Sequence, residues 1–301
     1  MNVVIFADGD QQLGAGHQVR TRALAEALFA ARHTVSMCCR DLPGSTHGWA
    51  WAGLPLVLLP GALSPREALA RCHGEVVVVD HYGIAGDDLP TDVPTVVLDD
   101  VPGRDLRRAA MVLNQNLGVA ADAYGAHGRV GPQYALLRAP FRARRWQATS
   151  ATGAVLVMLG GTDHLSLSTT IVEQLAAAEL PVLAISREVV ARPGVAVRAT
   201  ATADELAEAL STCRAAVFGA GSAVWEALCV GTPLVAIHTV DNQATIVAGL
   251  RAQQLATVLT PTTISEVAAA VRAARPPAPG VVDGRGAARM VQLMETLPCR
   301  A

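Results

Sequence analysis

Short apolar runs alternate along the chain with longer segments in which apolar residues recur at helical spacing. The first helical segment shows this spacing at Leu24, Ala25 and Leu28. In the first half of the chain, the predicted strands cover residues 3–7, 34–39, 56–59, 76–80, 95–98 and 111–113. In the second half, they cover residues 154–159, 181–185, 195–198, 215–218, 233–237 and 256–259. Strands that alternate with helices predict parallel sheets with helices on both faces.

The pattern starts again in the middle of the chain, which indicates two domains. Residues 141–152 are basic and then small and polar, with no apolar period, so we expect a linker there. The predicted domains are residues 1–145 and 153–301, a division that suits a chain of 301 residues. We expect a last helix at residues 286–297 that packs back on the N-terminal domain.

Composition narrows the class of protein. Hydrophobic residues make up 51% of the chain, and the formal charge of −2 gives no electrostatic reason to expect nucleic acid or an acidic membrane as a partner. No uninterrupted apolar run is long enough to span a bilayer, and the first residues lack the pattern of a signal peptide. The spacing of the cysteines suggests neither a zinc site nor a disulfide scaffold, so we expect reduced thiols in a cytoplasmic protein.

Polar and glycine-rich segments follow the predicted strands. In parallel α/β sheets, ligands bind beyond the carboxyl ends of the strands. Each segment alone is typical of a turn or a helix cap, but their joint placement favours a binding site. The segments are residues 80–83, 99–100, 114–116, 160–163, 219–222 and 241–243.

His17 stands in a glycine-containing turn between the first predicted strand and the first predicted helix. Gly14 and Gly16 allow the backbone to approach a ligand closely or to take a positive φ. The free amides of the first helical turn can bind an anion, and an imidazole there can act as a general base near neutral pH. The alternative is a solvated histidine in an ordinary turn.

A series of short motifs carries a resemblance that extends over almost the whole chain. The motifs are GAGHQVR (14–20), CRDLPG (39–44), VDHYG (79–83), LDD (98–100), LNQN (113–116), GPQYALLR (131–138), LGGTD (159–163), GAGSAVWEAL (219–228), DNQ (241–243) and DGRGAAR (283–289). In this order they closely resemble the PseG-like UDP-sugar hydrolases of the pseudaminic acid pathway. The resemblance implies the α/β fold called GT-B, two Rossmann-like domains facing across a cleft, which MurG-like glycosyltransferases share.

The resemblance also implies that the second domain binds the nucleotide. Gly160 and Gly161 would let the backbone approach the diphosphate, and Gly221 and Ser222 would offer amides to it. Glu226 would accept hydrogen bonds from the ribose hydroxyls. The alternative for Glu226 is an exposed helix residue or a capping box with Ser222.

In the first domain, the resemblance makes His17 the catalytic base. Tyr82 and Asn242 match positions that contact the sugar or water, and Asp80 and His81 would orient them. The full set of implied substrate-binding residues is Asp10, Gln12, Gly14, Gly16, Asp80, His81, Tyr82, Asn242 and Gln243.

The implied reaction is an inverting displacement at the anomeric carbon of a UDP-sugar, with UDP as leaving group and water as nucleophile. We expect no cofactor. We also expect no resident metal, because the histidines are scattered and Asp99 and Asp100 form a lone acidic pair, and a magnesium ion loosely bound to the diphosphate is left open. The nucleophile is left open by three departures from the family: Gln11 and Gln12, the short stretch 163–204, and the helix start GSAVWEAL. A small-acceptor glycosyltransferase, such as a cytosylglucuronic acid synthase that joins cytosine to the sugar of UDP-glucuronate, is the first alternative. A noncatalytic nucleotide-sugar binding protein is the second.

Overall fold

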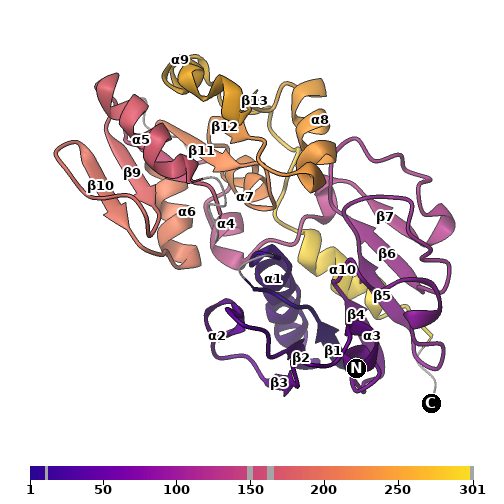
Figure 1. The fold of residues 1–301 in the computed structure, drawn as a ribbon. Coiled ribbons are helices and arrows are strands. Elements are labelled where there is room, and N and C mark those ends of the chain that lie inside the picture. Colours follow the sequence, from indigo (N-terminus) through magenta and orange to yellow (C-terminus); the bar gives the residue numbers. More distant parts are fainter. Residues whose placement is uncertain (11–12, 148–151, 161–165, 299–301) are drawn as a thin grey trace. The chain divides into compact units, whose positions relative to one another are not determined.

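The computed structural model describes residues 1–10, 13–147, 152–160 and 166–298, and it is drawn in Figure 1. The strands are β1 Asn2–Phe6, β2 Thr34–Arg40, β3 Leu56–Leu59, β4 Val76–Val79, β5 Thr95–Leu98, β6 Met111–Asn114, β7 Gly128–Val130, β8 Val155–Met158, β9 Val182–Ile185, β10 Val195–Arg198, β11 Ala215–Gly219, β12 Leu234–Ile237 and β13 Thr257–Leu259. Every predicted strand is present, with its ends within one residue of the prediction. Strand β7 was missed, because its three residues contain a single apolar side chain.

The helices alternate with these strands as the sequence pattern predicts. They are α1 Gly16–Ala30, α2 His47–Ala50, α3 Pro65–Leu69, α4 Ala139–Ala143, α5 Leu167–Ala177, α6 Ala203–Thr212, α7 Ala223–Val230, α8 Ala244–Ala252, α9 Val267–Ala273 and α10 Gly286–Met294. Short 3-10 turns are η1 Gly86–Asp88, η2 Gly125–His127, η3 Pro132–Tyr134, η4 Asp241–Gln243 and η5 Pro261–Glu266. Among the described residues, no helix is long and apolar enough to cross a membrane.

The strands form two sheets in which all neighbouring strands run parallel (Figure 1). The first sheet has the order β3-β2-β1-β4-β5-β6-β7, and the second has the order β10-β9-β8-β11-β12-β13. In the first sheet β1 pairs with β4, and β4 pairs with β5. The loops that follow β1, β4 and β5 therefore leave the same edge of the sheet side by side.

The chain divides into two compact units. Unit 1 is Met1–Leu137 together with Arg285–Ala301, and unit 2 is Arg138–Gly284. Residues 138–145 therefore belong to unit 2, whereas the sequence analysis assigned them to the first domain. The reason is α4, in which Phe141 is fully buried and its carbonyl oxygen accepts a contact from the thiol of Cys229 on α7. The predicted linker at residues 141–152 is thus wrong at its start, where Phe141 belongs to a buried helix, and residues 148–151 lie outside the described residues.

The core of unit 1 follows the two-residue period of its strands. Val3 and Ile5 of β1 pack on one face with apolar residues of α1 and α10, whereas Val4 and Phe6 pack on the other face with residues of α3. Met290 of α10 is completely buried in this core, so the C-terminal helix is part of unit 1. In unit 2, apolar residues of β8 pack with those of α5 and α9.

Candidate functional site

The turn after β1 places His17 at the carboxyl edge of the first sheet. The backbone N–H of Gly14 donates to the carbonyl oxygen of Asp10 at 2.9 Å, and Gly14 has a φ of 74°, which strongly favours glycine. The Asp10 carboxylate accepts a further hydrogen bond from the N–H of Leu13 at 2.7 Å. The chain then enters α1 at Gly16, and His17 lies buried in the first helical turn.

His17 makes a short contact with a fully buried carboxylate. Its Nδ1 lies 2.6 Å from Oδ1 of Asp80, the residue that directly follows β4. A carboxylate offers only acceptors, so we assign the hydrogen to Nδ1, which leaves a lone pair on Nε2. No described residue hydrogen-bonds to Nε2. The ring of Tyr82 meets the imidazole edge-on, with centroids 4.8 Å apart.

Arg20 ties this pair to a second carboxylate. It lies one helical turn after His17, and its Nε and Nη2 each donate to Asp80 at 2.6 Å. Its Nη1 donates to Oδ1 of Asp100, which follows β5, at 2.7 Å. The hydroxyl group of Tyr82 donates to the other oxygen of Asp100 at 2.6 Å. His17, Arg20, Asp80, Tyr82 and Asp100 thus form one connected network, named here the His17 cluster.

Charge interactions keep the two carboxylates of this cluster ionised. Burial alone raises the pKa of Asp80, but Arg20 and His17 outweigh it and hold that pKa well below its usual range. Burial also raises the pKa of Asp100, but the positive charge of Arg20 outweighs burial, so the pKa of Asp100 is lowered. Burial and the charge of Asp100 raise the pKa of Tyr82, so its hydroxyl group stays protonated as a donor.

Two further ion pairs support the loops around the cluster. In the first, Asp8 accepts from Nε of Arg40 at 2.8 Å, and Nε2 of His81 lies 3.3 Å from the same carboxylate oxygen. Burial raises the pKa of Asp8, but His81 and Arg40 together outweigh it, so that pKa is lowered. The Nδ1 of His81 accepts from the N–H of Gly83, so the His81 ring is used within its own loop.

The second pair joins Asp99 to Arg104. Nη2 of Arg104 donates to Asp99 at 2.7 Å, and its Nη1 donates to the carbonyl oxygens of His81, Tyr82 and Ile84. Arg104 therefore fastens the loop that carries Tyr82.

Sequence reasoning selected His17, Asp80 and Tyr82 as site residues, placed Asp100 only in a segment expected near the site, and gave no role to Arg20. Asp100 and Arg20 both stood in quoted motifs. A signal was available for Arg20, because a residue three positions after His17 on a helix lies on the same face. The partner of Arg20 was not readable, because its contacts are 60 and 80 residues away along the chain.

The residues expected to bind the nucleotide lie in unit 2. Gly221 and Ser222 immediately precede α7, and Gly160 follows β8 with a φ of 112°. Glu226 on α7 is buried, and its carboxylate accepts from Nη2 of Arg138 at 2.9 Å. Burial raises the pKa of Glu226 against the opposing effect of Arg138. Glu226 is therefore neither exposed nor in a capping box with Ser222, and its role toward ribose stays a prediction.

The remaining expected site residues differ in exposure and in their hydrogen bonds. Gln243 uses its side-chain oxygen to accept from the N–H of Thr239 at 2.9 Å, so it stabilises its own turn. Asn242 beside it is exposed, as is Gly16 in unit 1. Gln12 and Gly161 lie outside the described residues.

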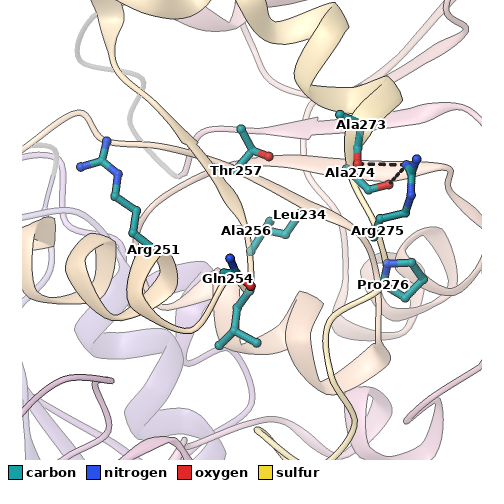
Figure 2. A pocket seen from close by; sticks show the side chains of 10 residues that line it. Leu234, Arg251, Gln254, Ala256, Thr257, Ala273, Ala274, Arg275 and Pro276 are labelled. Atoms are coloured by element: carbon teal, nitrogen blue, oxygen red, sulfur yellow. Dashed lines mark hydrogen bonds between the residues drawn. The ribbon is translucent and has the colours of Figure 1, made fainter.

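A cavity of about 350 Å³ lies elsewhere in unit 2 (Figure 2). It is lined by Leu234 and Thr257, the first residues of β12 and β13, so it opens at the amino ends of these strands. In Figure 2 the guanidinium of Arg275 donates to the carbonyl oxygens of Ala273 and Ala274 and so closes the end of α9. None of the expected site residues lines this cavity.

Two of the described thiols lie close together, since Sγ of Cys72 donates to Sγ of Cys38 at 3.0 Å. In the described ranges, no group of three or more His, Cys, Asp or Glu side chains is placed to hold a metal ion. Cys38, Cys39, Cys72, Cys213 and Cys229 are buried free thiols. Burial raises the pKa of Cys39, Cys213 and Cys229 to about 12, so these three thiols stay protonated near neutral pH. Cys299 lies outside the described residues.

Known proteins resemble the chain in sequence and in fold. No family model matches the chain. The spore coat polysaccharide biosynthesis protein SpsG of Bacillus subtilis (strain 168) is 25% identical over 276 residues, which cover 81% of this chain and 79% of that protein.

Solved glycosyltransferase structures resemble the chain over nearly its whole length. MurG of Acinetobacter baumannii superposes with a TM-score of 0.60 at 15% identity, covering 98% of this chain and 99% of that one. The Streptomyces sp. SF2575 glycosyltransferase SsfS6, complexed with thymidine diphosphate, gives 0.62 at 15% identity, with coverages of 99% and 96%. Arabidopsis thaliana UGT89C1, complexed with UDP, gives 0.63 at 12% identity, with coverages of 97% and 99%. The chain therefore has the GT-B fold of these structures, with two Rossmann-like domains that are each built on a parallel sheet.

Proposed function

We propose that the protein is an enzyme that releases UDP from a UDP-sugar by a single displacement at the anomeric carbon, with His17 as general base and water as nucleophile. The observation that carries this proposal is the contact of 2.6 Å between Nδ1 of His17 and the buried carboxylate of Asp80. That contact orients the imidazole and leaves Nε2 without a partner among the described residues. A histidine held in this way is suited to accept a proton at Nε2.

Bonds, electrons and protons balance in this single step. The oxygen of water forms a bond to C1 while the bond from C1 to the phosphate oxygen breaks, the electron pair of that bond leaves with UDP, and the proton of water goes to Nε2 of His17. Attack from the side opposite the leaving group inverts the configuration at C1. Asp80 stabilises the imidazolium that forms, because its carboxylate stays ionised.

Unit 2 is proposed to bind the nucleotide. The N–H groups of Gly221, Val224 and Trp225 already donate to backbone carbonyl oxygens, so the amides of Ser222 and Ala223 at the start of α7 would bind the diphosphate. Gly221 and Gly160 have open space where a side chain would stand, which allows a ligand to approach the backbone. Glu226 would accept from the ribose hydroxyls as well as from Arg138.

The structural neighbours support a nucleoside diphosphate as the ligand class. UGT89C1 was solved with UDP, and SsfS6 was solved with thymidine diphosphate. Both resemble this chain over nearly its whole length, so the same fold is able to hold such a ligand.

Transfer of the sugar to a small acceptor is the second candidate. The structural neighbours described as glycosyltransferases favour it, whereas the hydrolase motifs of the sequence favour water. His17 would serve both reactions, because water and an acceptor group each lose a proton as they attack C1.

Product analysis in ¹⁸O-labelled water separates the candidates. The protein is incubated with a panel of UDP-sugars, including UDP-glucuronate, with and without cytosine as a trial acceptor. Hydrolysis predicts UDP release in buffer alone, with ¹⁸O on C1 of an inverted sugar. Release that depends on an acceptor, with a new glycosidic bond and no label, would replace hydrolysis by transfer. Tight binding of UDP-sugars without any turnover would support a noncatalytic binding protein.

A further inference from the structure

Besides His17 and its partner Asp80, the His17 cluster contains two further charged side chains, Arg20 and Asp100. We propose that Arg20 and Asp100 are positioning residues that set how readily His17 accepts a proton, by leaving one unbalanced negative charge in a buried cluster. The inference rests on the proposed role of His17, but it concerns the protonation of the free protein and is tested there.

The contacts show why Arg20 controls Asp80. The guanidinium donates to both oxygens of Asp80, and its Nη2 also lies 3.3 Å from Nδ1 of His17. This position fixes the plane of the carboxylate and therefore the direction in which the imidazole is held. It also brings a permanent positive charge close to the ring, which disfavours the imidazolium.

Asp100 supplies the opposing charge. It accepts from Nη1 of Arg20 and from the hydroxyl group of Tyr82, and its side chain is only 11% exposed. Nδ2 of Asn116 also points to it at 3.2 Å. With Arg20 positive and both Asp80 and Asp100 negative, the cluster keeps one net negative charge while His17 is neutral. Uptake of one proton at His17 makes it neutral overall.

Two neighbouring carboxylates each have an arginine of their own. Asp99 is paired with Arg104, and Asp8 is paired with Arg40. Tyr82 and Tyr124 act as hydroxyl donors to Asp100 and Asp99, and burial raises the pKa of both phenols. His81 lies at the Asp8 pair and not in the cluster. Among the ion pairs described at this edge, the His17 cluster is the one in which two carboxylates share one guanidinium, and Asp10 adds a further carboxylate in the turn before His17.

Two substitutions are expected to move the titration of His17 in opposite directions. Arg20→Gln removes the positive charge nearest to the ring, so the imidazolium is favoured and the midpoint rises by about 1 pH unit or more. Asp100→Asn removes a negative charge, so the midpoint falls by a smaller amount. The double variant restores the original net charge, and its midpoint is expected between those of Arg20→Gln and the wild type.

The measurement is NMR of the free protein with ¹³C-labelled histidine rings, titrated from about pH 5 to pH 9. The His17 signal is identified by its loss in His17→Gln, among the 8 histidines of the chain. Arg20→Lys keeps the charge and is expected to keep the midpoint. Arg22→Gln is the matched control on the same helix, because Arg22 is also hydrogen-bonded but belongs to a balanced pair with Glu26.

Arg20→Gln leaves two buried carboxylates without their cation, so of these variants it is expected to lose the most stability. If it does not fold, Asp100→Asn and the double variant are used for the comparison. Equal midpoints in all folded variants, or shifts of the same sign in Arg20→Gln and Asp100→Asn, would overturn the inference. A merely structural role predicts lost stability without opposite shifts. If the shifts occur but no UDP-sugar is turned over, the inference holds and the proposed function fails.

Discussion

Replacing Asp80 by asparagine tests the proposed mechanism at the group that orients the base. The substitution keeps the size of the side chain and removes its charge. In the wild type this carboxylate faces three donors: Nδ1 of His17 and both Nε and Nη2 of Arg20, each at 2.6 Å. An amide has one oxygen and one NH₂ group, so its NH₂ group faces at least one of these three donors and that hydrogen bond is lost.

The size of the effect follows from these contacts. Hydrogen bonds to a charged group contribute about 1.5 to 3 kcal/mol each, but they are not additive. Arg20 keeps its bond to Asp100, so the guanidinium is not left unpaired. We therefore expect a loss of about 3 kcal/mol in the free energy of unfolding, the lower end for a broken buried ion pair. The imidazole also loses the partner that holds Nδ1–H, so kcat/KM is expected to fall by about a hundredfold or more.

The assay is UDP release from the best UDP-sugar of the panel, together with urea unfolding and calorimetric binding of UDP. Asp105→Asn is the control, because it also breaks an Asp–Arg pair, but at an exposed position. Asp80→Asn is expected to bind UDP as the wild type does. A folded Asp80→Asn protein whose kcat/KM stays within about threefold of the wild type would refute the proposed role of the pair.

Three further predictions follow from the same contacts. His17→Ala should fold and bind UDP but lose at least about a hundredfold in turnover, and near-normal turnover would remove His17 from the mechanism. Glu226→Ala should weaken UDP binding by about 1 to 3 kcal/mol, and UDP should slow hydrogen exchange in residues 219–228. Protection confined to residues 1–137 would show that the nucleotide binds unit 1 and not unit 2. The difference in free energy of unfolding between the wild type and Asp80→Asn should be largest above the ordinary aspartate pKa of 3.8 and should shrink as the pH falls below it. The reason is that the lowered pKa of Asp80 in the folded state stabilises the protein only while the unfolded state is also ionised. A constant difference in urea unfolding down to about pH 2 would contradict this.

The strands could be read from the sequence because each one is a buried apolar run of the kind that parallel sheets require. Residues 76–79, four valines in a row, are an example. Strand β7 lacks such a run and depends on pairing with β6, so local pattern did not reveal it. Phe141 was read as part of a linker because α4 has only five residues, too few for a helical period.

Residues of the candidate site could be predicted only where the local sequence around them indicates a binding turn. His17 could be selected from its glycine turn. The joining of Arg20 to Asp80 and Asp100 depends on the strand order β1-β4-β5, in which β1 neighbours a strand that is not next in sequence. The pair of Arg138 with Glu226 likewise joins residues 88 positions apart. Periodicity says which residues are buried, but it does not say which loops meet.

The course of the chain has a consequence for how the protein is synthesised and folded. Unit 2 is one continuous segment, whereas unit 1 needs both ends of the chain, because α10 completes its core with Met290 and Met294. Domains usually fold in the order in which they emerge from the ribosome. Here the unit that begins first cannot close its core until α10 has been made, so unit 2 can finish folding before it. A nascent chain stalled before residue 286 should therefore hold a protease-resistant unit 2 and an incomplete unit 1.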